Sequence, residues 1–177
     1  RCYNTSLVIG PNGTLIASYR KIHLFDVDVE DGVRFKESDT ICPGSTAVVA
    51  STPCGTLGLS ICYDLRFPEL YRNLVDQGAE ILTVPSAFTQ KTGEAHWHVL
   101  LRARAIENQA WLLAPGQVGH HDDEGLRHSY GHSMIINPWG EIVAEIPQGE
   151  GYCIATIDLG QVQRVRQSMP IGQHRRF

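Results

Sequence analysis

Cys62 is the residue whose setting most favours covalent chemistry. An apolar strand pattern over residues 56–61 delivers it to the short segment 62–66, and an amphipathic helix pattern begins at Phe67. A thiol ahead of a helix N-terminus lies at the positive end of the helix dipole, which lowers its pKa and favours the nucleophilic thiolate. The backbone N–H groups of such a turn can also hold an oxyanion. A buried, unreactive cysteine at a strand end is the alternative that this segment leaves open.

Lys21 is a candidate cation for the same site. It follows a predicted hairpin whose strands, residues 4–9 and 14–19, flank Pro11-Asn12-Gly13, a turn signal because Asn-Gly tolerates positive φ. Lys21 or Arg20 could point a positive charge into a site at the strand ends. A solvated charge at a strand end is the alternative interpretation.

The spacing of the eight histidines does not indicate a metal site. His96 and His98 are two positions apart, which places them on different sides of a helix. Four more surround one predicted loop without an HxxxH, HExxH or Cys/His pattern, namely His120, His121, His128 and His132. Neither a Gly-x-Gly-x-x-Gly nor a Walker pattern occurs, so a nucleotide cofactor is not indicated either.

The elements that must position these residues alternate between strands and helices. Apolar periodicity predicts helices over residues 67–77, 95–108 and 159–167, and buried strands over 80–84 and 111–114. Further strands are predicted over 47–51, 133–137, 141–146 and 152–157, with a long acidic loop over 26–44 and a surface loop over 119–130. This order predicts a layered α/β protein with a mixed sheet.

Composition excludes several classes of function. The 177 residues carry a net charge of −4, which does not suggest a nucleic-acid or anionic-membrane partner. No apolar run reaches the ~18 residues of a membrane span.

The five cysteines are an odd number without a CxxC pair, which favours a reducing compartment, and we expect a cytoplasmic protein. The chain begins with Arg1 rather than Met, and its first predicted strand already starts at residue 4, so we expect an upstream piece to be missing.

Several segments together resemble the nitrilase superfamily of carbon–nitrogen hydrolases, and most closely its Nit-type amidase branch. They are Tyr-Arg-Lys-Ile-His-Leu-Phe-Asp-Val-Asp at 19–28, Phe-Lys-Glu-Ser at 35–38, Ile-Cys-Tyr-Asp-Leu-Arg-Phe-Pro-Glu-Leu at 61–70, His-Trp-His-Val-Leu-Leu-Arg-Ala-Arg-Ala-Ile-Glu-Asn at 96–108 and Gly-His-Ser-Met-Ile-Ile-Asn-Pro-Trp-Gly at 131–140. The resemblance implies an α-β-β-α sandwich, assembly into homodimers or higher homo-oligomers, and a Glu–Lys–Cys catalytic set that uses no metal and no organic cofactor.

Position by position, the resemblance assigns four site residues. Cys62 matches the nucleophile, Lys21 the catalytic lysine and Glu37 a second glutamate beside the site, while Tyr63 supplies an oxyanion N–H from its backbone. The general-base glutamate of the family lies upstream of the motif that begins at Tyr19, and residues 1–20 contain no Glu. We therefore expect residues 1–177 to be the C-terminal portion, about two-thirds, of a single domain. The N-terminal part would then be missing, and this piece alone could be inactive.

The implied reaction is hydrolysis of the C–N bond of a small, carboxylate-bearing amide through a cysteine thioester. Residues 119–134 look more like the deaminated-glutathione amidase type than the ω-amidase type. Arg127 and His128 are the candidates for binding the substrate carboxylate. Two alternatives stay open, an ω-amidase acting on α-ketoglutaramate or α-ketosuccinamate, and a catalytically inactive fragment or interaction protein.

Overall fold

The computed structural model of the chain describes residues 1–28, 34–121 and 128–176. Its centre is a six-stranded sheet in the order β12-β11-β8-β7-β6-β5. The six strands are β5 (Val49–Thr52), β6 (Gly55–Leu59), β7 (Ile81–Thr83), β8 (Trp111–Ala114), β11 (Met134–Ile136) and β12 (Ile142–Glu145). Strands β6, β7 and β8 run parallel, and the other pairings are antiparallel. The predicted α/β class with a mixed sheet is confirmed.

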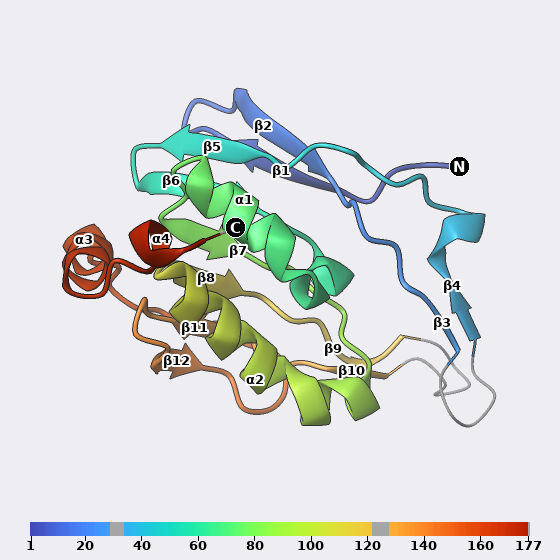
Figure 1. Cartoon of the computed structure of the whole chain (residues 1–177). Coiled ribbons are helices and arrows are strands. Elements are labelled where there is room, and N and C mark those ends of the chain that lie inside the picture. The colour runs from blue at the N-terminus through green and yellow to red at the C-terminus, as the bar shows by residue number, and fades with distance from the viewer. Residues whose placement is uncertain (29–33, 122–127, 177) are drawn as a thin grey trace.

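Two helices make the crossovers between the parallel strands. The helix α1 (Pro68–Asp76) joins β6 to β7, and α2 (Gln90–Asn108) joins β7 to β8. Both lie on the same face of the sheet (Figure 1). Helix α2 begins five residues before the predicted start at residue 95 because its first turn is polar and lacks apolar periodicity. It ends where Gln109 adopts a left-handed conformation, with φ 50°.

The main core lies between this face of the sheet and the two helices. Leu82 and Leu112 face it from neighbouring strands, and Trp97 and Leu101 face it from α2; all four are fully buried. Gly58 on β6 leaves room for the Leu82 side chain to pack closely over the strand, because a Cβ at position 58 would lie only 3.0 Å from that side chain.

The helix α3 (Leu159–Ser168) covers part of the opposite face. Its Val162 packs against Ile81 and Trp111, which are paired across β7 and β8. Asp158 caps the helix by accepting a hydrogen bond from the Gly160 N–H at 2.8 Å, and its carbonyl accepts from the Trp111 indole N–H at 3.0 Å. The final helix predicted over residues 159–167 is therefore confirmed. A short helix, α4 (Ile171–His174), follows it.

Three two-stranded pieces lie outside the main sheet. The hairpin of β1 (Thr5–Ile9) and β2 (Leu15–Arg20) confirms the prediction made from Asn12-Gly13. The pair β3 (Asp26–Asp28) and β4 (Arg34–Lys36) leads into the 3₁₀ helix η1 (Glu37–Asp39). The pair β9 (Val118–His120) and β10 (His128–Tyr130) lies at the same side of Figure 1 as β3 and β4.

Three predictions about irregular and regular structure are wrong. Residues 26–44 are not one long loop, since β3, β4 and η1 lie within the described part of this segment. Residues 119–130 are not simply a loop, since their described ends pair as β9 and β10. Residues 152–157 do not form the last strand, although the segment alternates as a strand would. Tyr152 is 85% and Ile154 79% exposed, and the segment has no strand partner among the described residues. It runs over the surface into α3.

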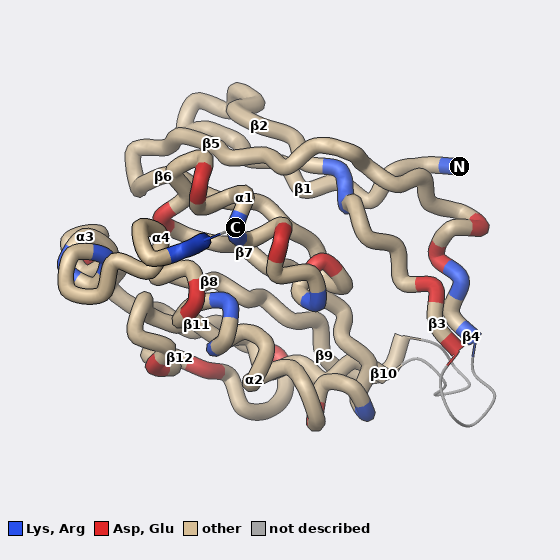
Figure 2. The backbone as a smooth tube through the Cα atoms, viewed as in Figure 1, with Lys and Arg blue, Asp and Glu red and all other residues tan. Residues whose placement is uncertain are grey.

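Charged residues lie around the inner strands of the sheet rather than within them. In the view of Figure 2, basic and acidic residues are interspersed, and the strands β7, β8 and β11 carry neither. Every helix in the described part of the chain is too short or too polar to cross a membrane.

Candidate active site

A broad groove of about 1400 Å³ opens at the carboxyl ends of the parallel strands. Three segments form its floor, each following one of these strands: 61–62 after β6, 85–87 after β7 and 115–117 after β8. Backbone hydrogen bonds continue the sheet into this floor, from the Cys62 N–H to the Pro85 carbonyl (2.9 Å) and from the Ser86 N–H to the Pro115 carbonyl (3.0 Å). Ligands of α/β proteins bind at this end of a parallel sheet.

Cys62 stands at the first position of the 3₁₀ helix η2 (Cys62–Arg66). Its φ is 50°, a left-handed conformation that is costly for a residue with a Cβ and that clusters at functional sites. The side chain is half-buried and lines the groove. The turn therefore holds the sulfur toward the space where a substrate would lie.

The environment of Cys62 keeps its thiol protonated. Burial raises the pKa of the thiol, and this effect outweighs the lowering by a hydrogen bond from the Ala87 backbone and by the charge of Lys21. Glu37 raises the pKa further, whereas the Tyr63 N–H lowers it. The predicted lowering by a helix dipole is wrong, because α1 begins only at Pro68 and desolvation dominates. Attack by this sulfur requires a base.

Lys21 and Glu37 form an ion pair at the groove. Lys21 is only 2% exposed, so the alternative of a solvated charge at a strand end is wrong. Its ammonium pairs with Glu37 Oε2, and that same oxygen accepts a hydrogen bond from the Phe25 N–H at 2.7 Å. The Lys21 backbone is fixed on both sides, by Asn4 and Gly44. An amino group held at this place can donate hydrogen bonds to an oxyanion in the groove.

Asp64 links the Lys21 segment to the Cys62 turn. This carboxylate is fully buried and accepts hydrogen bonds from the Tyr19 hydroxyl (2.6 Å), the Ile61 N–H (2.9 Å) and the His23 N–H (3.0 Å). The Nδ1 of His23 lies 2.7 Å from it as well. Burial and the Asp64 charge raise the pKa of Tyr19, so the hydroxyl remains a donor. Sequence reasoning missed this role, although Asp64 and Tyr19 both lie in motifs quoted above.

The residues predicted to bind a carboxylate lie at the rim. His128 lines the groove from β10, and its ring stacks on that of His120 with centroids 4.2 Å apart. Arg127 lies outside the described residues. His121 also lines the groove and makes a 2.7 Å hydrogen bond with Ser129. Across the groove, the basic residues Arg34 and Lys36 line it from β4.

The structure thus brings Cys62, Lys21, Glu37 and His128 to one groove, and the Tyr63 N–H faces the sulfur. Ala87 is a further contact of the thiol that the sequence analysis did not single out. The sequence offers one signal for this contact, which is the position of Ala87 shortly after a buried strand that pairs with the strand leading to Cys62.

The carbon–nitrogen hydrolase family model matches residues 1–167 of this chain. A protein named deaminated glutathione amidase from Synechocystis sp. is 52% identical over 179 residues, which cover 100% of this chain and 65% of the relative. The chain therefore spans less than two-thirds of that relative's length.

Solved structures agree with this similarity. The C. elegans NitFhit protein superposes with a TM-score of 0.92 at 47% identity, covering 98% of this chain and 42% of that one. Saccharomyces cerevisiae Nit3, described as a member of branch 10 of the nitrilase superfamily, gives a TM-score of 0.86 at 38% identity and covers 99% of this chain and 60% of that one. These matches confirm the expected nitrilase-type fold, and the chain belongs to the carbon–nitrogen hydrolase family.

Proposed function

We propose that this protein is an amidase that hydrolyses the C–N bond of a small, carboxylate-bearing amide through a thioester on Cys62. The observation that carries the proposal is the strained Cys62 turn in the same groove as the buried Lys21–Glu37 pair. The name of the Synechocystis relative supports deaminated glutathione as the type of substrate.

The first half of the reaction forms the thioester. The Cys62 sulfur attacks the amide carbonyl carbon as the thiol proton passes to a base, and the carbonyl oxygen becomes an oxyanion. The Lys21 ammonium and the Tyr63 N–H stabilise that oxyanion, at about 3–4 kcal/mol for each donor. The C–N bond then breaks, and the departing amine takes a proton.

The second half releases the acid. Water attacks the thioester carbonyl, the C–S bond breaks, and the Cys62 thiol regains its proton. The base that the resemblance implies is a glutamate upstream of the Tyr19 motif, which stays a prediction. Glu37 holds Lys21 and the Phe25 N–H rather than the sulfur, so we assign it the role of positioning the lysine.

Basic groups at the rim support an anionic substrate. Arg34, Lys36 and His128 line the groove, and a carboxylate in the substrate would be attracted to them. We propose that Arg127 and His128 bind that carboxylate, as the motif predicts.

We further propose a cytoplasmic, homo-oligomeric protein. All five cysteines are free thiols, which favours a reducing compartment. The exposed Tyr152 and Ile154 on the segment leading to α3 favour a contact with a second copy. Sedimentation of the wild-type protein against Tyr152→Ser would test the contact, and an unchanged mass in the variant would exclude this segment from it.

The decisive experiment uses the whole protein and measures amine release from deaminated glutathione. On the wild-type protein, mass spectrometry after acid quenching should detect an acyl adduct. Cys62→Ala should abolish both this adduct and turnover. Cys54→Ala, at an exposed turn, is the matched control and should leave both unchanged. Normal turnover in Cys62→Ala would refute the proposal. Glu37→Gln should lower kcat, because Lys21 loses its anionic partner.

A further inference from the structure

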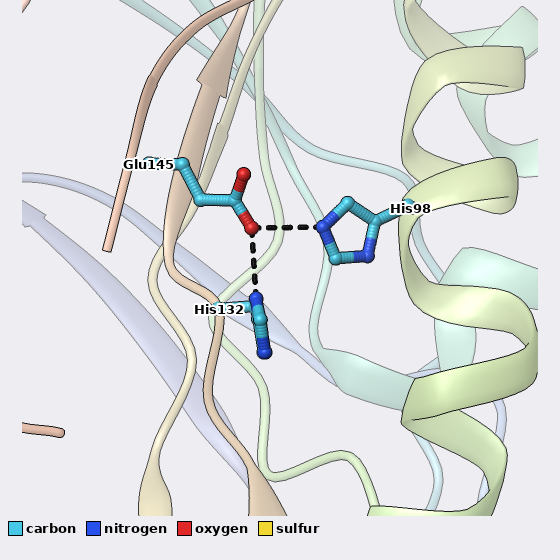
Figure 3. A group of neighbouring side chains, drawn as sticks. All are labelled: His98, His132 and Glu145. Atoms are coloured by element: carbon cyan, nitrogen blue, oxygen red, sulfur yellow. Dashed lines mark hydrogen bonds and ion pairs between the residues drawn. The ribbon is translucent and has the colours of Figure 1, made fainter. Parts of the chain in front are cut away.

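Three side chains outside the groove converge on one point. His98 Nε2 and His132 Nδ1 each lie 2.8 Å from the same oxygen of Glu145, Oε1 (Figure 3). The three atoms lie within 4.8 Å of one another. They come from separate elements: His98 from α2, Glu145 from β12 and His132 from the segment between β10 and β11.

We propose that His98, His132 and Glu145 bind a Zn²⁺ ion, with water completing the coordination. Imidazole and carboxylate ligands suit this metal, and two histidines with one glutamate and an open position are an established zinc ligand set. The side chains are 32%, 22% and 26% exposed, so an ion can enter and a water can reach it.

The three ligand atoms can reach zinc-binding distances from one another by movement of the side chains alone. Zn–N and Zn–O bonds of about 2.0–2.2 Å at tetrahedral angles place ligand atoms about 3.3 Å apart. The two N···O distances of 2.8 Å must therefore open by about 0.5 Å, and the two nitrogens must approach each other by at most about 1.5 Å. Each histidine binds through the nitrogen that already faces the carboxylate and carries its proton on the other.

The backbone around His132 is already fixed for this arrangement. His132 has a φ of 51°, and its carbonyl accepts a 2.8 Å hydrogen bond from the Trp97 indole. Its ring stacks on Tyr130 with centroids 4.1 Å apart. The backbone that carries this ligand is thus ordered before any ion binds, so binding requires only side-chain movement, which limits the entropy lost.

The ion would sit behind the wall of the groove. His132 precedes Ser133, which lines the groove and accepts a hydrogen bond from the Gly116 N–H at 2.8 Å. None of the three ligands lines the groove itself. A bound ion would cross-link α2, β12 and this segment, and so stiffen the wall without touching substrate.

The test is calorimetric titration of the metal-free whole protein with Zn²⁺. We expect one ion per chain, and a dissociation constant raised by more than about tenfold in His98→Gln and in Glu145→Gln, since even an outer partner of a ligand is worth 10–100-fold. Both variants keep a polar side chain at the substituted position, which limits the loss of folding stability. His96→Ala, on the same helix beside Arg66, is the matched control and should bind as wild type does.

A second measurement distinguishes metal binding at this site from metal binding by the cysteine thiols. Co²⁺ bound by histidine and carboxylate lacks the thiolate charge-transfer band, and its visible spectrum should persist in Cys62→Ala and vanish in Glu145→Gln. Equal Zn²⁺ affinity in wild type and both ligand variants would overturn the proposal. A thiolate band that is lost in Cys62→Ala would overturn it too, because the ion would then lie in the groove.

Discussion

Replacing Asp64 by alanine tests whether one buried carboxylate holds the site together. The change removes the acceptor of four hydrogen bonds, two of them from His23, and leaves the Tyr19 hydroxyl and the Ile61 N–H buried without it. Each buried donor left unpaired costs about 1–3 kcal/mol, which gives about 2–6 kcal/mol for these two. His23 is 27% exposed and can turn to water, so we assign it no further cost.

The loss should be measured by urea denaturation. We expect a lower midpoint with an unchanged m-value, because the unfolded state exposes the same surface. Asp76→Ala is the matched control, since this aspartate is 51% exposed and pairs with Arg175 at the surface. A surface pair of that kind is worth about 0–1 kcal/mol.

Activity should fall together with stability. Asp64 joins the chain around Lys21 to the Cys62 turn, so its loss should lower kcat in the fraction that remains folded at low temperature. Equal midpoints for Asp64→Ala and Asp76→Ala would refute the reasoning, because the carboxylate would then contribute no more than a surface pair.

Two further predictions concern packing and protonation. Gly93→Ala should cost about 1–3 kcal/mol in urea denaturation, because a Cβ there would lie 2.3 Å from the Tyr130 side chain; Gly172→Ala, with open space around it, should not. In the 177-residue chain, iodoacetamide should modify Cys62 more slowly than the exposed Cys54 at pH 8. The raised pKa of Cys62 means that its thiolate forms only at higher pH, so its modification rate, followed by peptide mass spectrometry, should climb with an inflection above the ordinary range of a cysteine thiol. An inflection below that range would contradict the burial argument.

The sequence predicts the local features of this molecule well. Asn12-Gly13 identifies the first hairpin and apolar periodicity identifies α1, while the motif resemblance selects Cys62 and Lys21, which both line the groove. These signals depend on neighbours along the chain. The strand pair β9–β10 was missed because each strand is three residues long, with no alternating pattern.

Contacts between distant residues could not be predicted. Asp64 is separated by 45 positions from Tyr19, and His98 by 47 from Glu145. No periodicity links such pairs, and the fold alone makes them neighbours. The same limit explains the error at residues 152–157, whose alternation is that of a strand but whose segment lies beside no partner strand in the described structure.

The groove is built from two kinds of structure. Its floor is an extension of the parallel sheet, so a substitution there would disturb the central strands and the position of the nucleophile. The small pairs β3–β4 and β9–β10, which lie outside the main sheet, also contribute lining residues. Substitutions in these pairs that spare Glu37 and His128 can therefore change the lining of the groove without altering the packing of the central strands.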